Sequence, residues 1–230
     1  MRETAHLFCV RTPSAFSDRG LFASQTDLPN TFFGGIIMSR QTANRTRKLT
    51  TMAMLAAISI VLVALIHFPI IPGATFLEYD PADVSILVGT FLFGPWAGLA
   101  LTAVVSVIQG LTVSAGSGVI GILMHFLATG VFSVLAGSIY QKWHTRKGAL
   151  VGLLLGSLAM TAVMCLCNLI FTPLFMGGTA KDVAAMLIPI IIPFNLVKAL
   201  GNSAITYLVY KPISKLVFGR EQPVLTTSAK

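Results

Sequence analysis

Long apolar stretches alternate with short polar segments along most of the chain, from Leu49 to Val217. A helix needs roughly 20 apolar residues to cross the hydrocarbon core of a bilayer. We place such helices at residues 49–68, 82–93, 96–113, 118–141, 149–172 and 187–210. The pattern therefore predicts an all-α membrane protein with six transmembrane helices.

The second of these helices is short, and Gly94-Pro95 stands between it and the third helix. Proline disfavours helical backbone at the residue that precedes it. We therefore predict a sharp turn at this dipeptide rather than a loop.

The composition also favours a membrane location. Hydrophobic residues make up 55% of the 230 residues and charged residues 10%, and the mean hydropathy is +0.82. A soluble domain of this size could not keep so much apolar surface in water. The formal net charge of +8 would suit a nucleic-acid partner, but the basic residues lie at the ends of the apolar segments. We therefore expect a lipid bilayer as the environment and no nucleic acid as a partner.

The basic residues gather in the segments that precede the first helix, join the fourth helix to the fifth and follow the sixth. They are Arg40, Arg45, Arg47, Lys48, Lys142, Arg146, Lys147, Lys211, Lys215 and Arg220. Cytoplasmic segments of membrane proteins carry an excess of Lys and Arg. We therefore predict a multi-pass protein of the plasma membrane with both termini in the cytoplasm, which agrees with an even number of spans.

Residues 1–37 differ from the rest, because their Pro, Ser, Thr, Phe and isolated charges follow no helical or strand period. Codons for the two glycines that precede Ile36 can spell a ribosome-binding site, so our hypothesis is that translation starts at Met38. A genuine disordered tail is the alternative. The chain then divides into this extension, a basic cytoplasmic segment, a six-helix membrane domain and a cytoplasmic tail, at residues 1–37, 38–48, 49–218 and 219–230.

Polar residues share one face of the last apolar segment, where Asn195, Lys198 and Asn202 are spaced as i, i+3 and i+7. Ionisable residues inside a membrane are costly and by default mark a ligand or ion site. Two prolines precede this face, and irregular backbone at such depth is tolerated only where it faces protein or a cavity. We favour a pocket open to the outside, with Asn168 of the fifth helix beside it, over snorkelling of Lys198.

An acidic loop at residues 69–81 leads from the first helix into the second. Its prolines and glycine favour a structured cap on the outer side over a helix. Glu78, Asp80 and Asp83 could accept hydrogen bonds from ligand hydroxyls, and Tyr79 could pack against a ligand ring. The alternative is that the acids solvate the loop and that one of them caps the second helix, a role we favour for Asp83.

Other features concern contacts between helices. Gln109 and His125 are lone polar groups in the third and fourth helices, and such groups more often join helices than bind a substrate. In the first helix, Ala53 and Ala57 form an AxxxA pair with Ala56 beside them. Small residues four apart let another helix approach closely.

The sequence lacks the motifs of common catalytic and ATP-binding sites. GxxxxGK[ST], HExxH and GxSxG are absent, and Cys9, Cys165 and Cys167 have no metal-ligand spacing. We therefore expect no enzyme activity, no metal and no cofactor. If the protein transports a ligand, the energy comes from a partner subunit or an ion gradient.

The chain resembles the riboflavin-specific S components of energy-coupling-factor (ECF) vitamin importers. The similar strings are FLEYDPADVSILVGTFLFGPWAGL, GVIGILMHFLATG, NLIFTPLF and PFNLVKALGN, and the resemblance runs from about Thr50 to Lys215. It implies a bacterial six-helix membrane protein that captures riboflavin from outside. It also implies two kinds of partner, a transmembrane T component and a pair of ATP-binding subunits.

The resemblance further implies roles for particular residues. Asn168, Asn195 and Lys198 match positions that hydrogen-bond the polar edge of the isoalloxazine ring. Ala53 and Ala57 match the helix face that meets the T component, and no residue is assigned to the ribityl chain. Two alternatives stay open: an S component for another vitamin, such as pantothenate or thiamine, and a stand-alone secondary transporter coupled to protons or sodium.

Overall fold

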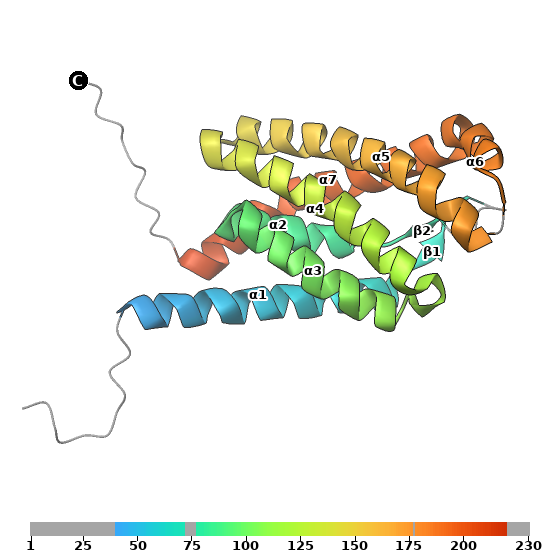
Figure 1. Cartoon of the computed structure of the whole chain (residues 1–230). Coiled ribbons are helices and arrows are strands. Elements are labelled where there is room, and N and C mark those ends of the chain that lie inside the picture. The colour runs from blue at the N-terminus through green and yellow to red at the C-terminus, as the bar shows by residue number, and fades with distance from the viewer. Residues whose placement is uncertain (1–39, 72–76, 177, 220–230) are drawn as a thin grey trace, which may run out of the picture. The chain divides into compact units, whose positions relative to one another are not determined.

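The computed structural model describes residues 40–71, 77–176 and 178–219, and most of these residues are helical (Figure 1). The hypotheses on residues 1–37 and on a start at Met38 lie outside the described residues. So do Cys9, the centre of the acidic loop and nearly all of the expected cytoplasmic tail.

The α-helices of the described chain are α1 (Arg40–Leu65), α2 (Ala82–Phe93), α3 (Pro95–Leu111), α4 (Gly118–Trp143), α5 (Arg146–Met176), α6 (Ala180–Met186) and α7 (Ile192–Phe218). A single 3₁₀ turn at Ala115–Ser117 precedes α4, and a π-helix at Leu187–Ile191 joins α6 to α7. Two short strands, β1 (Phe68–Pro69) and β2 (Glu78–Tyr79), pair in antiparallel fashion.

Within the described ranges, the segments long and apolar enough to cross a membrane are Arg45–Leu65, Ala115–Trp143, Arg146–Leu174 and Ala180–Phe218. The helices α2 and α3 are also apolar but have only 12 and 17 residues. Large apolar side chains are exposed along the long helices, and in a bilayer they contact acyl chains instead of water. The chain is therefore a mostly helical, multi-pass membrane protein.

The hydrophobic pattern predicts α2 with its observed bounds but misplaces the ends of α1 and α7. α1 begins nine residues before the expected 49–68 helix, because the polar segment from Arg40 contains no proline or glycine. It ends at Leu65, and Phe68 pairs in β1 instead, so the small sheet departs from a wholly helical fold. α7 continues to Phe218 rather than residue 210, through Pro212.

The sharp turn between α2 and α3 is confirmed. Gly94 alone separates the two helices, with φ 94° and ψ 171°, and Pro95 is the first residue of α3. Glycine reaches a positive φ without steric cost, and proline at a first helical position loses no hydrogen bond. The chain therefore reverses within a single residue.

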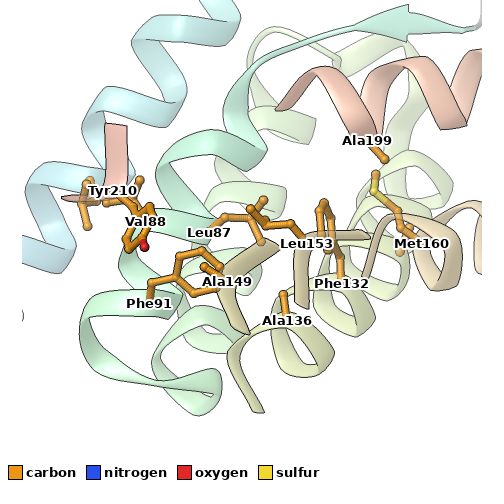
Figure 2. Close-up of a cluster of buried hydrophobic side chains, with 12 residues drawn as sticks. Leu87, Val88, Phe91, Phe132, Ala136, Ala149, Leu153, Met160, Ala199 and Tyr210 are labelled. Carbon is orange, nitrogen blue, oxygen red and sulfur yellow. The ribbon is translucent and has the colours of Figure 1, made fainter. Parts of the chain in front are cut away.

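α2 lies at the centre of the helical bundle. Every residue from Ala82 to Phe91 is buried, and α2 contacts α1, α3, α4 and α7. The main core cluster joins its Leu87 and Phe91 to Phe132 of α4 and Leu153 of α5 (Figure 2). This position brings the start of α2, and the acidic loop before it, into the interior of the protein.

α4 and α5 approach each other closely at glycines of α5. A Cβ atom added to Gly152 would lie 2.9 Å from the carbonyl oxygen of Ala136, and one added to Gly156 would meet the ring of Phe132. Such close backbone contact is the usual packing of membrane helices. It fixes α5, which carries Asn168, against α4.

Candidate functional site

Three polar side chains share one buried face of α7, as the sequence pattern predicts. Asn195, Lys198 and Asn202 are 0%, 8% and 0% exposed. The π-helix at Leu187–Ile191 precedes them, so the backbone is irregular where the prolines predict it. Nδ2 of Asn195 donates to the carbonyl of Ile191 at 2.8 Å. Its Oδ1 has no hydrogen-bond partner within the described part of the chain.

The Lys198 ammonium forms a buried ion pair with the acidic loop. Its Nζ lies 2.7 Å from Oδ2 of Asp80 and donates at 3.4 Å to the backbone carbonyl of Glu78. Snorkelling of Lys198 is therefore excluded. Burial by itself raises the pKa of the Asp80 carboxyl, but the nearby ammonium, His125 and two hydrogen bonds outweigh it and hold the pKa below its usual range.

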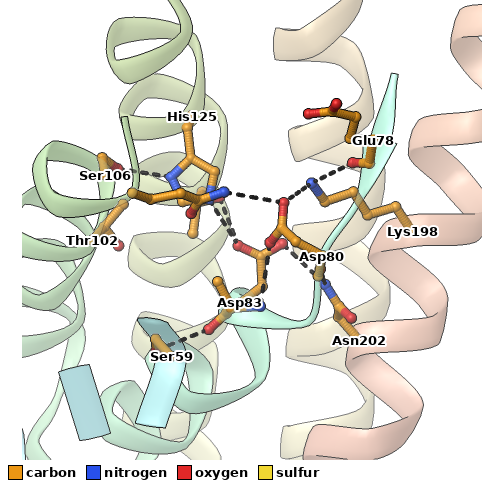
Figure 3. Close-up of polar contacts among 12 residues, drawn as sticks. Ser59, Glu78, Asp80, Asp83, Thr102, Ser106, His125, Lys198 and Asn202 are labelled. Carbon is orange, nitrogen blue, oxygen red and sulfur yellow. Dashed lines mark hydrogen bonds and ion pairs between the residues drawn. The ribbon is translucent and has the colours of Figure 1, made fainter. Parts of the chain in front are cut away.

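Asp83 is fully buried at the start of α2, and its expected role as a helix cap is wrong. The capping position is Pro81, and Oδ1 of Asp80 accepts the first backbone N–H of the helix at 3.2 Å. Asp83 instead accepts from Thr129 Oγ1 at 2.8 Å and from Asn202 Nδ2 at 3.2 Å (Figure 3). The carboxylate thus joins α2 to α4 and α7.

Tyr79 belongs to the same network. Its hydroxyl donates to Oδ1 of Asn202 at 3.0 Å, and its ring lies 5.7 Å from that of Phe68, measured between centroids. Burial, together with the negative charge of Asp80, raises the pKa of the Tyr79 hydroxyl, so it stays a hydrogen-bond donor. Tyr79 therefore fastens β2 to α7.

Gln109 and His125 connect elements, as expected for lone polar groups. Nδ1 of His125 lies 2.7 Å from Oγ of Ser106, which links α4 to α3. Nε2 of Gln109 donates to Oδ2 of Asp80 at 3.4 Å, which links α3 to the acidic loop. In Figure 3, His125 and Ser106 lie on one side of Asp80 and Lys198 on the other.

These residues surround a cavity of about 150 Å³ between α3 and α4 on one side and α5 and α7 on the other. The seven site residues predicted from the sequence divide into two groups. Tyr79 and Asp83 do not line the cavity, and the others do: Glu78, Asp80, Asn168, Asn195 and Lys198. Gln109 and His125 line it as well.

Glu78 and Asn168 mark different parts of the cavity wall. The Glu78 side chain is partly exposed and pairs with His67, with 2.7 Å between Oε2 and Nε2. Asn168 is 1% exposed; its Nδ2 donates to the Met164 carbonyl at 2.8 Å, and its Oδ1 accepts from Thr172 at 2.9 Å. Nδ2 and Oδ1 of Asn168 each keep one further hydrogen-bonding position.

The rest of the wall is apolar or aromatic, with Leu77, Ala128, Met160, Met164, Phe171 and Phe194. Apolar walls with a few fixed polar groups are typical of small-molecule sites. In the residues that the structure describes, no group of three His, Cys, Asp or Glu side chains could hold a metal ion. The apolar wall with its few polar groups favours a small organic ligand.

The sequence matches a known family over most of its length. The family model described as "ECF transporter, substrate-specific component" covers residues 47–210. The chain belongs to this family. The members are transporter subunits rather than enzymes.

Individual relatives of this S component carry names that specify a vitamin. The riboflavin transporter RibU of Streptococcus thermophilus is 31% identical over 180 residues, which cover 75% of this chain and 85% of that protein. The riboflavin transporter FmnP of Bacillus subtilis is 29% identical over 174 residues, which cover 72% and 91%.

Solved structures show the same fold. The S component of a bacterial ECF transporter has a TM-score of 0.65 and 32% sequence identity, over 75% of this chain and 98% of that one. ThiT from Listeria monocytogenes has a TM-score of 0.56 at 16% identity, over 76% and 98%, and shares the fold alone.

The small residues of α1 in this S component divide between its surface and its core. Ala53 and Ala57 are exposed. Ala56 is only 8% exposed and packs in a core cluster with Ile86 and Leu101, so it is not available to a partner. The expected partner surface is therefore reduced to the AxxxA pair.

Sequence reasoning assigned Gln109 and His125 to helix contacts and missed that both also line the cavity. It gave no role to Ser106, which lies one turn before Gln109 on the same face of α3. That i, i+3 pair of polar residues in an apolar helix was the available signal. The sequence carries no such signal for the apolar and aromatic wall, because its residues resemble those at any other position of a membrane helix.

Proposed function

We propose that this S component binds riboflavin from the outer side of the membrane and delivers it through a transmembrane T component, driven by two ATP-binding subunits. The observation that carries the proposal is the cavity with buried Asn195 and Lys198 at its wall. The names of the RibU and FmnP relatives support riboflavin over other vitamins.

The polar edge of an isoalloxazine ring offers two carbonyl acceptors and one imide donor. Oδ1 of Asn195 is a buried acceptor without a partner in the described chain, which suits the imide N–H. The Lys198 ammonium has a third hydrogen beyond its two contacts, and Asn168 Nδ2 has a second. Phe171 and Phe194 offer aromatic surface to the dimethylbenzene end.

The membrane topology that fits this role has six spans: α1, α2, α3, α4, α5 and the continuous segment from α6 through α7. Both termini then lie in the cytoplasm, in accord with the basic residues at the ends of α1, α4, α5 and α7. The basic segment 38–48 continues as the start of α1 from Arg40. The exposed Ala53 and Ala57, in the middle of α1, form the contact with the T component.

Titration of the detergent-purified chain with riboflavin, followed by visible absorption and fluorescence quenching, tests the proposal. Asn195→Ala should weaken binding by about 1 to 3 kcal/mol, because it leaves a ligand donor unpaired in a buried site. Gln141→Ala, at an exposed amide near the end of α4, serves as the matched control and should bind like the unaltered chain. Equal affinity of all three proteins contradicts the site, and failure to bind riboflavin contradicts the function.

A further inference from the structure

An apolar groove lies between α5 and α7 and shares no wall residue with the ligand cavity. It encloses about 360 Å³, and leucines and one alanine make up its wall together with Ser203 and Tyr207. The Ser203 hydroxyl already has a partner, because its Oγ lies 2.9 Å from Oγ of Ser157. The α5–α7 groove is therefore almost wholly apolar.

The α5–α7 groove is long and open on the outer surface of the bundle. Its wall runs from Leu200 to Leu208 along α7, which is about 12 Å at a rise of 1.5 Å per residue. On α5, Leu150 and Leu154 belong to the wall, and both are about half exposed. An elongated apolar groove on a membrane helix pair suits an extended acyl chain better than a compact molecule.

Basic residues stand beyond one end of the groove. On α5, Arg146 precedes Leu150 by four residues, so the two share a helix face. On α7, Lys211 follows Tyr207 by four residues and shares its face in the same way. Because α5 begins at the end of the bundle where α7 ends, the two positive charges lie at the same end of the groove (Figure 1).

Within the described ranges, no acidic side chain forms an ion pair with these two residues. The acidic residues of those ranges are Glu78, Asp80, Asp83 and Asp182. The first three lie near His67, Lys198 and His125, and the fourth belongs to α6. In Figure 1, α6 and the small sheet lie at the opposite end of the bundle from the start of α5. The groove thus combines an apolar length with an unneutralised positive end.

Basic residues between membrane helices attract anionic lipid headgroups. We propose that the α5–α7 groove binds an anionic phospholipid, with one acyl chain along the leucines and the phosphate between Arg146 and Lys211. Tyr207, one turn before Lys211, has the amphipathic ring that favours the boundary between acyl chains and headgroups. This lipid site is separate from riboflavin capture and does not depend on which ligand fills the cavity.

Native mass spectrometry of the purified full chain in an uncharged detergent tests the proposal. The chain is titrated with phosphatidylglycerol and with phosphatidylcholine of the same acyl chains, so that only the headgroup charge differs. Each basic residue near an anionic headgroup contributes about fivefold in affinity. Phosphatidylglycerol should therefore bind about twentyfold more tightly than phosphatidylcholine.

Charge variants test the headgroup contacts. Arg146→Gln and Lys211→Gln should each lose about fivefold in affinity for phosphatidylglycerol and less than about twofold for phosphatidylcholine. Arg45→Gln, at an exposed basic residue of α1, is the matched control and should bind both lipids like the unaltered chain.

A groove variant tests the acyl-chain contacts. Ala204→Phe places a large side chain in the groove and should remove the tight binding of phosphatidylglycerol. Ala162→Phe, at an exposed alanine of α5 outside the groove, should keep it. Melting temperatures of all variants in the same detergent show whether each one is folded.

The outcomes are distinct. Equal affinity of the unaltered chain for the two lipids overturns the proposal, and this comparison requires no variant to fold. A loss in Arg45→Gln as large as in Lys211→Gln also overturns it, because the attraction then comes from general surface charge. If Ala204→Phe keeps its lipid but no longer copurifies with the T component, the groove is a partner surface instead. Riboflavin titration of the same samples tests the proposed function separately, since neither result determines the other.

Discussion

Lys198 and Asp80 show what a charged residue requires among apolar helices. Each is almost fully buried. Lys198 donates hydrogen bonds to Asp80 and to the Glu78 carbonyl, and Asp80 also accepts one from Gln109 of α3. Separated charges in such surroundings are far more costly than the pair. The pair therefore also joins the loop before α2 to the N-terminal part of α7.

Asp80→Asn should destabilise the fold by about 3 kcal/mol, because it removes the charge that compensates the buried ammonium. The double variant Asp80→Asn with Lys198→Met should recover most of this loss, since no unpaired charge remains. Thermal unfolding in detergent measures both changes. A double variant no more stable than the single one would show that charge compensation is not the cause.

The sequence identifies Asn168, Asn195 and Lys198 because polar side chains stand out in apolar helices. It wrongly assigns Asp83 the role of helix cap, because the hydrogen-bond partners of Asp83, Thr129 and Asn202, lie 46 and 119 residues away along the chain. A helix cap is a local interaction and can be recognised from neighbouring residues, whereas this network forms only when α2, α4 and α7 meet. The apolar and aromatic wall of the cavity could not be predicted either, because its residues resemble those at other membrane-helix positions.

At the scale of elements, the hydrophobic pattern predicts where helices lie and gives the bounds of α2, but it misses the ends of α1 and α7. The turn at Gly94 is predicted correctly because a positive φ and a following proline are local signals. The start of α1 at Arg40 is missed because polar residues without helix breakers continue a helix beyond the membrane. The hairpin of β1 and β2 involves four residues, too few for a strand pattern.

The contact between α4 and α5 gives a prediction about packing. Gly152→Ala should destabilise the protein by about 1 to 3 kcal/mol, since the added methyl group is forced against the carbonyl of Ala136. Gly201→Ala in α7 meets nothing within 4 Å and should stabilise the helix by up to about 1 kcal/mol. Melting temperatures in one detergent compare the two, and a shift of the same sign would contradict the packing argument.

The proposed function assigns two regions to the whole molecule: a ligand cavity at the end of the bundle that carries the acidic loop, and a small-residue surface at Ala53 and Ala57 in the middle of α1. Separate locations allow capture and delivery to be altered independently. Ala57→Trp should leave riboflavin binding unchanged and abolish copurification with the T component, because a large side chain prevents close helix approach. Leu65→Trp, at a site 77% exposed on the same helix, is the control. Loss of binding in Ala57→Trp would contradict this separation.

The burial of α2 has a consequence for biosynthesis. Twelve residues of helix reach only about 18 Å, less than the roughly 30 Å of a hydrocarbon core, so α2 is a poor membrane-insertion signal. The one-residue turn at Gly94 couples it to α3, so we expect the two to enter the bilayer as a helical hairpin. Thr129 and Asn202 donate the hydrogen bonds that offset the cost of burying the Asp83 carboxylate, and both residues are synthesised later than α2. We therefore expect stable integration of this hairpin to need helices from the second half of the chain.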